Sequence, residues 1–206
     1  MTKPRITERS LARREAILDA AADLFFEQGY AATSIDAIIE RVGGSKRNVY
    51  TEFGNKEGLF TALVHRTAGQ ALSALRMDGL DGSDLRASLL AFSERLIGLY
   101  MSPTVIGIYR TAISEGARFP DLVRQFYEDG PLRASRGVAQ ELRAAQARGE
   151  LRDIDPDAAG NRLVAMLRDN AHLQVLLGLA PPPGGEQIRT AAATAVDLFL
   201  HGVRAA

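Results

Sequence analysis

Apolar residues recur along this chain at intervals of three and four positions, the spacing that places side chains on one face of an α-helix. The first such stripe predicts a helix from about Glu8 to Gln28, which a glycine ends. The second predicts a helix over 35–42, where Gly43 ends the pattern. Because no segment shows the pattern of a β-hairpin, we expect an all-α fold of roughly nine helices.

A short helix over 46–51 is expected directly after the glycine turn, because Ser45 is a suitable N-cap. Val49 and Phe53 would anchor this helix to a core, and Asn55 can cap a longer helix that follows. The outer face of the short helix is then polar and basic. A helix that only fills a core does not require such a face.

The remaining two thirds of the chain predict further helices. The turn-forming segment 78–83 separates them from the first four and is a plausible boundary. Apolar stripes predict helices that begin near Leu85 and at Pro103, the second with Ile113 among its inward residues. A helix near Pro120 should be kinked or interrupted at Gly130-Pro131.

The last two predicted helices cover 153–179, as one continuous element, and 186–206. They carry more apolar surface than one core-facing stripe needs, which favours a four-helix interface between two copies of the chain. The alternative is that both helices are central to the monomer. The residues that carry this surface are Leu163, Met166, Leu167, Leu173, Leu176, Leu177, Leu198, Phe199 and Leu200.

Composition narrows the class of protein. The 206 residues include no cysteine, which excludes a disulfide framework and thiolate metal sites. The N-terminus has no apolar signal segment, and no apolar run approaches the roughly 20 residues needed to cross a bilayer. We expect a cytoplasmic protein with no metal, no cofactor and no membrane partner.

The formal net charge of zero hides an uneven distribution. Residues 1–14 form a basic arm with a net charge of +4, and residues 41–56 carry +3, so the rest of the chain carries −7. A protein with a basic N-terminal region and an acidic remainder can bind an anion locally although its net charge is zero.

Two short helices joined by a glycine turn are the helix-turn-helix arrangement, whose second helix enters the major groove of DNA. Arg and Lys can reach guanine, Asn can pair with adenine, and hydroxyl groups and helix N-termini can bind phosphate. For a single residue, an ordinary solvated surface explains the pattern equally well; for the whole set, DNA binding explains it better. The predicted DNA-binding residues are Thr33, Ser34, Ser45, Lys46, Arg47, Asn48, Tyr50, Thr51 and Lys56.

Residues 12–65 resemble the DNA-binding domain of the TetR family of bacterial transcriptional regulators. The most specific part is VGGSKRNVYTEFGNKEGLF, in which the tyrosine, phenylalanine, Lys-Glu and leucine keep the family spacing. Of the predicted DNA-binding residues, all except Ser34 and Asn48 match positions where the family contacts DNA. Gly44 and Glu52 depart from the family pattern, and Glu52 removes one expected contact.

This resemblance implies a two-domain organisation. A DNA-binding domain over 1–56, which includes the basic arm, would be followed by an effector-binding domain over 57–206 that dimerises through its last two helices. The segment YRTAISEGARFPDLVRQFYEDGP is similar to the C-terminal domain of AefR-like repressors. The implied function is that of a repressor released from a palindromic operator by a small-molecule effector.

Polar and aromatic residues within the apolar helices of the second domain are candidate effector contacts, since small-molecule sites are largely apolar with a few polar groups. For each one, a satisfied polar residue or core aromatic is the stronger interpretation. The candidates are Phe92, Tyr100, Tyr109, Arg110, Phe126, Arg168, Asn170 and His172.

Enzyme chemistry finds little support in the sequence. The three histidines are scattered without metal-ligand spacing, and no nucleophile elbow or phosphate-binding loop occurs. We therefore expect no catalytic residues. The alternative to a regulator is a helical small-molecule-binding protein or enzyme with a degenerate helix-turn-helix.

Overall fold

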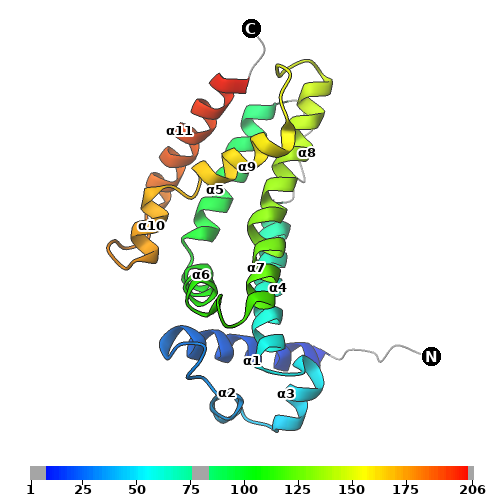
Figure 1. Cartoon of the computed structure of the whole chain (residues 1–206), viewed down its shortest axis with the longest axis vertical. Coiled ribbons are helices and arrows are strands. Elements are labelled where there is room, and N and C mark those ends of the chain that lie inside the picture. The colour runs from blue at the N-terminus through cyan, green and yellow to red at the C-terminus, as the bar shows by residue number, and fades with distance from the viewer. Residues whose placement is uncertain (1–7, 76–83, 204–206) are drawn as a thin grey trace, which may run out of the picture. The chain divides into compact units, whose positions relative to one another are not determined.

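The computed structural model describes residues 8–75 and 84–203, and all the regular elements in these ranges are helical (Figure 1). The expected turn at 78–83 and the first half of the basic arm lie outside the described residues. The chain divides into two compact units. The first consists of the chain up to Arg66 together with Gly107–Gln125, and the second of Thr67–Ile106 together with the chain from Phe126 onward.

The first unit begins with three helices whose positions agree with the sequence-based prediction. They are α1 (Glu8–Glu27), α2 (Ile35–Val42) and α3 (Lys46–Phe53), and α2 and α3 lie on the same side of α1 (Figure 1). The expected stripes form the core of this unit. Its large, deeply buried side chains include Ile17, Leu18, Phe25, Tyr30, Ile38, Val49, Leu59, Phe60 and Leu63.

Aromatic rings hold the end of α1 against α4 (Lys56–Leu75). The ring of Tyr30 lies 5.1 Å from that of Phe25 and 5.5 Å from that of Phe60, centroid to centroid. The rings of Tyr30 and Phe119 form a T-shaped pair with centroids 5.3 Å apart. Phe119 follows α6 (Pro103–Glu115), so segments far apart in the sequence share one aromatic cluster.

The second unit is built around two helix pairs. Helix α5 (Leu85–Tyr100) packs against α11 (Gly185–Val203), and α8 (Arg133–Ala147) packs against α9 (Pro156–Met166). Helix α8 approaches α9 closely at Gly160, where an added Cβ would lie 2.7 Å from the carbonyl oxygen of Ser135.

Two predicted helices are each divided in the structure, so that α1 to α11 exceed the roughly nine expected. The interruption expected at Gly130-Pro131 is confirmed: α7 (Pro120–Tyr127) passes through a π-helical turn, Glu128–Leu132, into α8. The single helix expected over 153–179 is wrong, because it consists of α9 and α10 (Asn170–Leu176).

Asp169 provides the reason for the second division. Its carboxylate accepts hydrogen bonds from the backbone N–H groups of Ala171, at 2.9 Å, and His172, at 3.4 Å, as an N-cap does. The apolar stripe continues across this cap, which is why the periodicity alone concealed the break. One further expectation fails in α6, where Ile113 is 73% exposed rather than buried.

The described residues also bear on two broader expectations. Within them no single helix is long and apolar enough to cross a membrane, and only α5 and α6, taken together across a sharp bend, reach that length and hydropathy. They contain no group of three His, Asp or Glu side chains that could hold a metal ion. The functional division at residue 56 stays a prediction.

Candidate nucleic-acid interface

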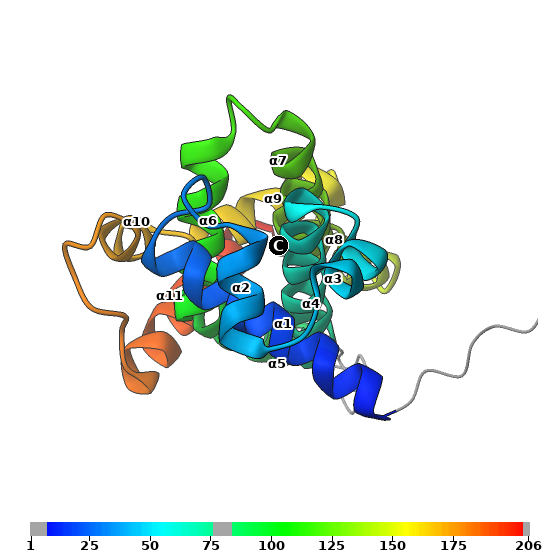
Figure 2. The same cartoon turned by 90° about the horizontal axis from the view of Figure 1, so that it is seen from below.

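The α2–α3 segment has the geometry of a helix-turn-helix (Figure 2). Ser34 caps α2, its Oγ accepting a hydrogen bond from the backbone N–H of Ala37 at 3.1 Å. Gly43 ends α2 with φ +77° and donates its N–H to the carbonyl of Ile39 at 2.7 Å. Gly44 follows with φ +114°, a backbone conformation that side-chain-bearing residues rarely adopt.

Helix α3 is anchored on one face and exposed on the other. Val49 is fully buried and Phe53 is 8% exposed, as the sequence predicted. The expectation that the polar residues of this segment face outward is also confirmed, although their contact with DNA stays a prediction. The exposed residues are Ser45, Lys46, Arg47, Asn48, Tyr50, Thr51 and Glu52.

Thr33 and Lys56 lie differently from the expectation that they face phosphate. Thr33 is 2% exposed, and its hydroxyl donates to the carbonyl of Leu24 at 3.0 Å or that of Gly29 at 2.9 Å. The Lys56 ammonium donates to the carbonyls of Tyr30, at 2.8 Å, and Thr33, at 3.0 Å, with Ala31 at 3.3 Å.

These contacts give both residues a structural role. Apart from that of Leu24, which lies in α1, the carbonyls belong to the turn between α1 and α2, whose backbone groups need partners. The Lys56 ammonium also lies 4.6 Å from the centroid of the Tyr30 ring, a cation–π distance. Burial lowers the pKa of Lys56. Thr33 and the partly exposed Lys56 therefore hold the α1–α2 turn in place, and their contact with DNA stays a prediction.

An open groove of about 710 Å³ lies between the first turns of α1 and the outer face of α3. Three guanidinium-bearing residues line it, two of them from α1, which the predicted list of DNA-binding residues did not include. The groove is lined by Arg9, Ser10, Arg13, Arg47, Asn48, Thr51 and Glu52. Its hydrogen-bond donors and net positive charge suit a phosphate backbone.

Gly44 explains how Arg13 comes to lie in this groove. The Arg13 Nη2 donates a hydrogen bond to the carbonyl of Gly43 at 3.1 Å. A Cβ built on Gly44 would lie 1.7 Å from the same nitrogen, so the guanidinium occupies the space that a side chain would take. The glycine at position 44, which departs from the family pattern, is thus the feature of the sequence that allows Arg13 to lie here.

Replacing Gly44 by alanine is expected to destabilise the first unit by about 1–3 kcal/mol, because φ is positive there, and to weaken DNA binding by displacing Arg13. Thermal unfolding and a DNA titration measure the two effects. Arg13→Gln should weaken DNA binding without the loss of stability. If Gly44→Ala weakens binding just as strongly in the Arg13→Gln background, displacement of Arg13 is not the cause.

Two basic residues of the α2–α3 segment form ion pairs within the protein. The Lys46 ammonium lies 2.6 Å from the Asp36 carboxylate of α2, and this hydrogen bond raises the pKa of Lys46. Arg41 pairs with Glu27 of α1 at 3.5 Å. Lys46 therefore has an acidic partner on the protein that DNA would have to replace or share.

The predicted effector residues fall into separate groups. In the second unit Tyr100 and Arg168 lie close to His172, with the two rings 5.7 Å apart and the guanidinium carbon 5.8 Å from the Tyr100 centroid. Burial lowers the pKa of His172, and the positive charge of Arg168 lowers it further. Phe92 is buried, Phe126 is half-buried and Asn170 is exposed at the start of α10.

Tyr109, which is buried, and Arg110, which is exposed, belong to the first unit. The second unit contains a largely apolar pocket of about 490 Å³, which none of the eight predicted residues lines. Met101, which follows α5, contributes to its walls together with Leu167 and Ile188. Gln187 and Thr194 are polar groups in the lining. The pocket could not be predicted from the sequence, because its walls come from three segments that no local pattern connects.

The expected association surface is only partly exposed. Leu163, Leu167 and Leu200 are buried within the chain itself, with exposed fractions of 0%, 3% and 2%. Other large apolar side chains of the last two segments are exposed. They are Met166, Leu173, Leu177, Leu179 and Leu198, at 36%, 51%, 63%, 74% and 63%.

Comparison with family models gives matches to both parts of the chain. Residues 17–63 match bacterial regulatory proteins of the tetR family, and residues 87–202 match the C-terminal domain of AefR-like transcriptional repressors. Helix-turn-helix repressor ComR of Escherichia coli K12 is 47% identical over 53 residues. That match spans 26% of this chain and only 25% of ComR.

Solved structures match over nearly the whole length. The flavonoid-responsive regulator FrrA is 31% identical, with a TM-score of 0.77 over 94% of this chain and 97% of FrrA. A putative TetR-family transcriptional regulator from Mesorhizobium loti is 27% identical, with a TM-score of 0.83 over 97% of this chain and 100% of that chain.

Proposed function

Because the chain belongs to the TetR family of bacterial transcriptional regulators, whose DNA-binding and C-terminal domains it matches, we propose that it represses transcription from a palindromic operator and is released by a small-molecule effector. One observation supports this proposal most directly. A helix-turn-helix presents a polar α3 beside a groove lined by Arg9, Arg13 and Arg47.

Different exposed residues would contact the bases and the phosphates of the operator. Arg47 and Asn48 can read base edges in the major groove, since a guanidinium pairs with guanine and an amide with adenine. Tyr50 and Thr51 carry hydroxyl groups that can donate to phosphates. Ser34, exposed at the N-terminus of α2, places free backbone N–H groups and the positive end of the helix dipole at the same surface.

Dimerisation follows from the exposed apolar side chains of the second unit. Leu173, Leu177 and Leu198 expose more than half of their area, and a two-fold axis would bury the same patch on both copies. Two helix-turn-helix units related in this way require half-sites about one or more DNA turns apart, with matching palindromy.

Replacing Leu177 by glutamate is expected to dissociate the homodimer, because burying a carboxylate in an apolar interface is costly. Sedimentation at micromolar concentration measures the fraction of monomer. Ile113→Glu is the matched control, since Ile113 is 73% exposed on α6 and lies outside the proposed interface. A Leu177→Glu protein that sediments as the wild type would place the interface elsewhere.

The effector site is proposed for the second unit. Its apolar pocket of about 490 Å³, with Gln187 and Thr194 as polar groups, has the chemistry of a site for a small, largely apolar molecule. The name of FrrA describes it as flavonoid-responsive, so flavonoids are the first compounds to test. The cluster of Tyr100, Arg168 and His172 is the second candidate location.

Release from the operator would act through α4. This helix begins at Lys56 in the first unit, continues past Arg66 and ends in the second unit. An effector that prefers one position of α4 can change operator affinity only by its differential affinity for the two states. On this proposal the functional division of the chain lies at residue 56, where α4 begins.

Selection of DNA fragments by the effector-free protein, at moderate and at high salt, tests the proposed function. We expect an inverted repeat whose retention falls steeply with salt, because phosphate contacts release counterions. Enrichment of no sequence by a folded dimer would contradict the proposal and favour the alternative, a helical small-molecule-binding protein or enzyme.

A further inference from the structure

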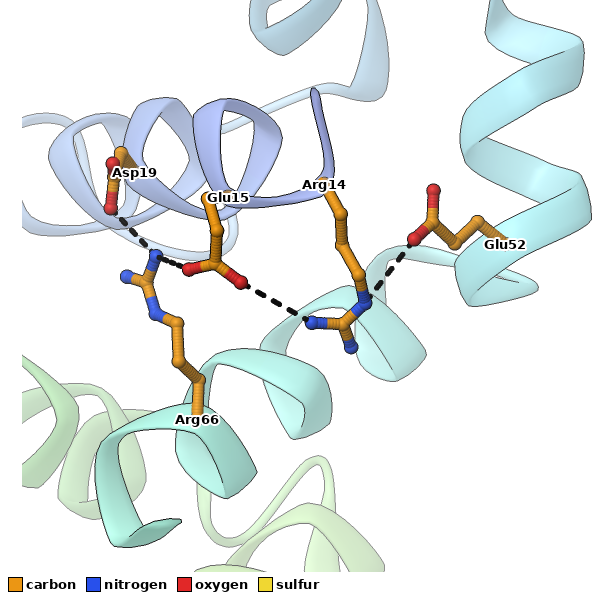
Figure 3. Close-up of polar contacts among 5 residues, drawn as sticks. All are labelled: Arg14, Glu15, Asp19, Glu52 and Arg66. Carbon is orange, nitrogen blue, oxygen red and sulfur yellow. Dashed lines mark hydrogen bonds and ion pairs between the residues drawn. The ribbon is translucent and has the colours of Figure 1, made fainter. Parts of the chain in front are cut away.

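A chain of alternating charges connects α4, α1 and α3 (Figure 3). From α4, the Arg66 Nη1 lies 2.7 Å from an Asp19 carboxylate oxygen and 3.2 Å from Oε2 of Glu15. The second oxygen of Glu15 lies 3.8 Å from the Arg14 Nη1. The Arg14 Nε then lies 3.2 Å from Oε1 of Glu52 on α3. We refer to these five residues as the ion-pair chain.

Arg66 is the least exposed residue of the ion-pair chain, and Arg14 and Glu52 are the next. The Arg66 side chain is 14% exposed, and those of Arg14 and Glu52 are each 34% exposed. The Arg14 guanidinium also lies 5.4 Å from the centroid of the Phe53 ring, which forms the buried anchor of α3. Partly shielded and mutually fixed charges interact more strongly than isolated surface pairs, which are screened and mobile.

The residues that α3 and α4 contribute to the ion-pair chain, Glu52 and Arg66, have different places in the molecule. Glu52 lines the basic groove and lies one helical turn after Asn48, so both are on the same face of α3. Arg66 is the last residue of α4 that belongs to the first unit, and α4 continues from it into the second. A displacement of α4 would therefore reach the ion-pair chain at Arg66.

The ion-pair chain also gives Glu52 a function other than binding DNA. A carboxylate beside phosphates is unfavourable unless its charge is compensated. Arg14 compensates it and at the same time ties the last turn of α3 to α1. Glu52, one of the two residues that depart from the family pattern, is thus the residue through which the ion-pair chain contacts α3.

We propose that Arg66 and Arg14 are positioning residues for DNA recognition: through Glu15 they fix the orientation of α3 by its Glu52 and transmit the position of α4 to it. This inference rests on the proposed binding of an operator by α3. Neither arginine needs to touch DNA for this role. Arg66 and Glu52 share no direct contact in the ion-pair chain. The role nevertheless requires that substitutions at these two residues have non-additive effects on operator affinity.

A double-mutant cycle with Arg66→Met and Glu52→Gln tests the proposal on the full-length protein and the operator selected by the wild type. Methionine keeps an apolar stem at the least exposed position, and glutamine keeps the shape of the glutamate. We expect the two changes in operator dissociation constant to deviate from additivity by about fivefold. In the Glu15→Gln background, which breaks the ion-pair chain in its middle, the deviation should fall to within about twofold, the scatter for independent sites.

Arg41→Met combined with Glu52→Gln is the matched control. It removes the same charges, but Arg41 pairs with Glu27, outside the ion-pair chain. Additivity in the Arg66 cycle, or an equal deviation in the Arg41 cycle, overturns the proposal. If Arg66→Met does not fold, Glu15→Gln, at a half-exposed residue, replaces it in the cycle with Glu52→Gln. Failure to obtain any operator would instead contradict the proposed function.

Discussion

Replacing Arg47 by alanine is expected to weaken operator binding by about 5- to 150-fold, because a bidentate contact between a guanidinium and guanine provides about 1–3 kcal/mol of discrimination. The loss should be largest for the preferred operator and smaller for an operator in which the contacted base pair is changed. Fluorescence anisotropy titrations with both duplexes at a fixed salt concentration measure this difference. Arg47 is exposed on α3, so thermal unfolding should change little.

Arg136→Ala provides the control for the loss of one positive charge. Arg136 is exposed on α8 in the second unit and lies outside the proposed DNA-binding surface. We expect it to leave operator affinity nearly unchanged. If both variants lose affinity equally for every duplex, then Arg47 contributes only general electrostatic attraction, and base recognition lies with other residues such as Asn48.

The helix-turn-helix could be predicted from the sequence because all of its signals are local. The apolar spacing of α2, the Ser34 cap and the glycine turn lie within a dozen residues, and Val49 and Phe53 point inward as the spacing requires. Local periodicity determines which face of a short helix is buried. The exposed face of α3 follows without knowledge of any other segment.

The roles of Thr33 and Lys56 could not be predicted in this way. Polar residues near helix N-termini are good candidates for phosphate contacts, but the carbonyls that Lys56 binds lie 23 to 26 positions away in the sequence. The same limit applies to Arg66, whose partners Glu15 and Asp19 are separated from it by 51 and 47 positions. Such pairs become visible only when the packing of the helices is known.

The break between α9 and α10 illustrates a different limit. The sequence contains evidence for and against a break here. The pair Asp169-Asn170 favours the start of a new helix, whereas the apolar stripe favours one continuous helix. The stripe continues because residues on both sides of the break are apolar: Leu163 and Val175 are buried, and Leu173 and Leu177 are exposed. Hydrophobic spacing cannot distinguish apolar side chains that stay exposed on the chain from those that are buried within it.

Gly58 is the position in the first unit where a small change is expected to have the largest effect on stability. An added Cβ would lie 1.9 Å from the carbonyl oxygen of Phe53, which is backbone and cannot turn away as a side chain could. Only Gly54 and Asn55 separate α3 from α4, and the Asn55 carboxamide oxygen accepts a hydrogen bond from the Gly58 N–H at 2.7 Å. The connection therefore has little freedom to relax.

We expect Gly58→Ala to destabilise the unit by about 3 kcal/mol, the upper part of the usual range for overpacking, and to weaken operator binding by shifting α3. Hydrogen exchange of the amides of α1, α2 and α3, which all lie in the first unit, measures the stability of this unit. Gly98→Ala makes the same chemical change within α5, where no atom lies within 4 Å of the added Cβ. There alanine should stabilise the helix by about 0.5–1 kcal/mol, since glycine is the more flexible residue in the unfolded chain. Equal exchange rates in the Gly58→Ala and wild-type proteins would contradict this prediction. They would mean that the α3–α4 connection can shift with no loss in the free energy of unfolding, and that it does not hold α3 rigidly.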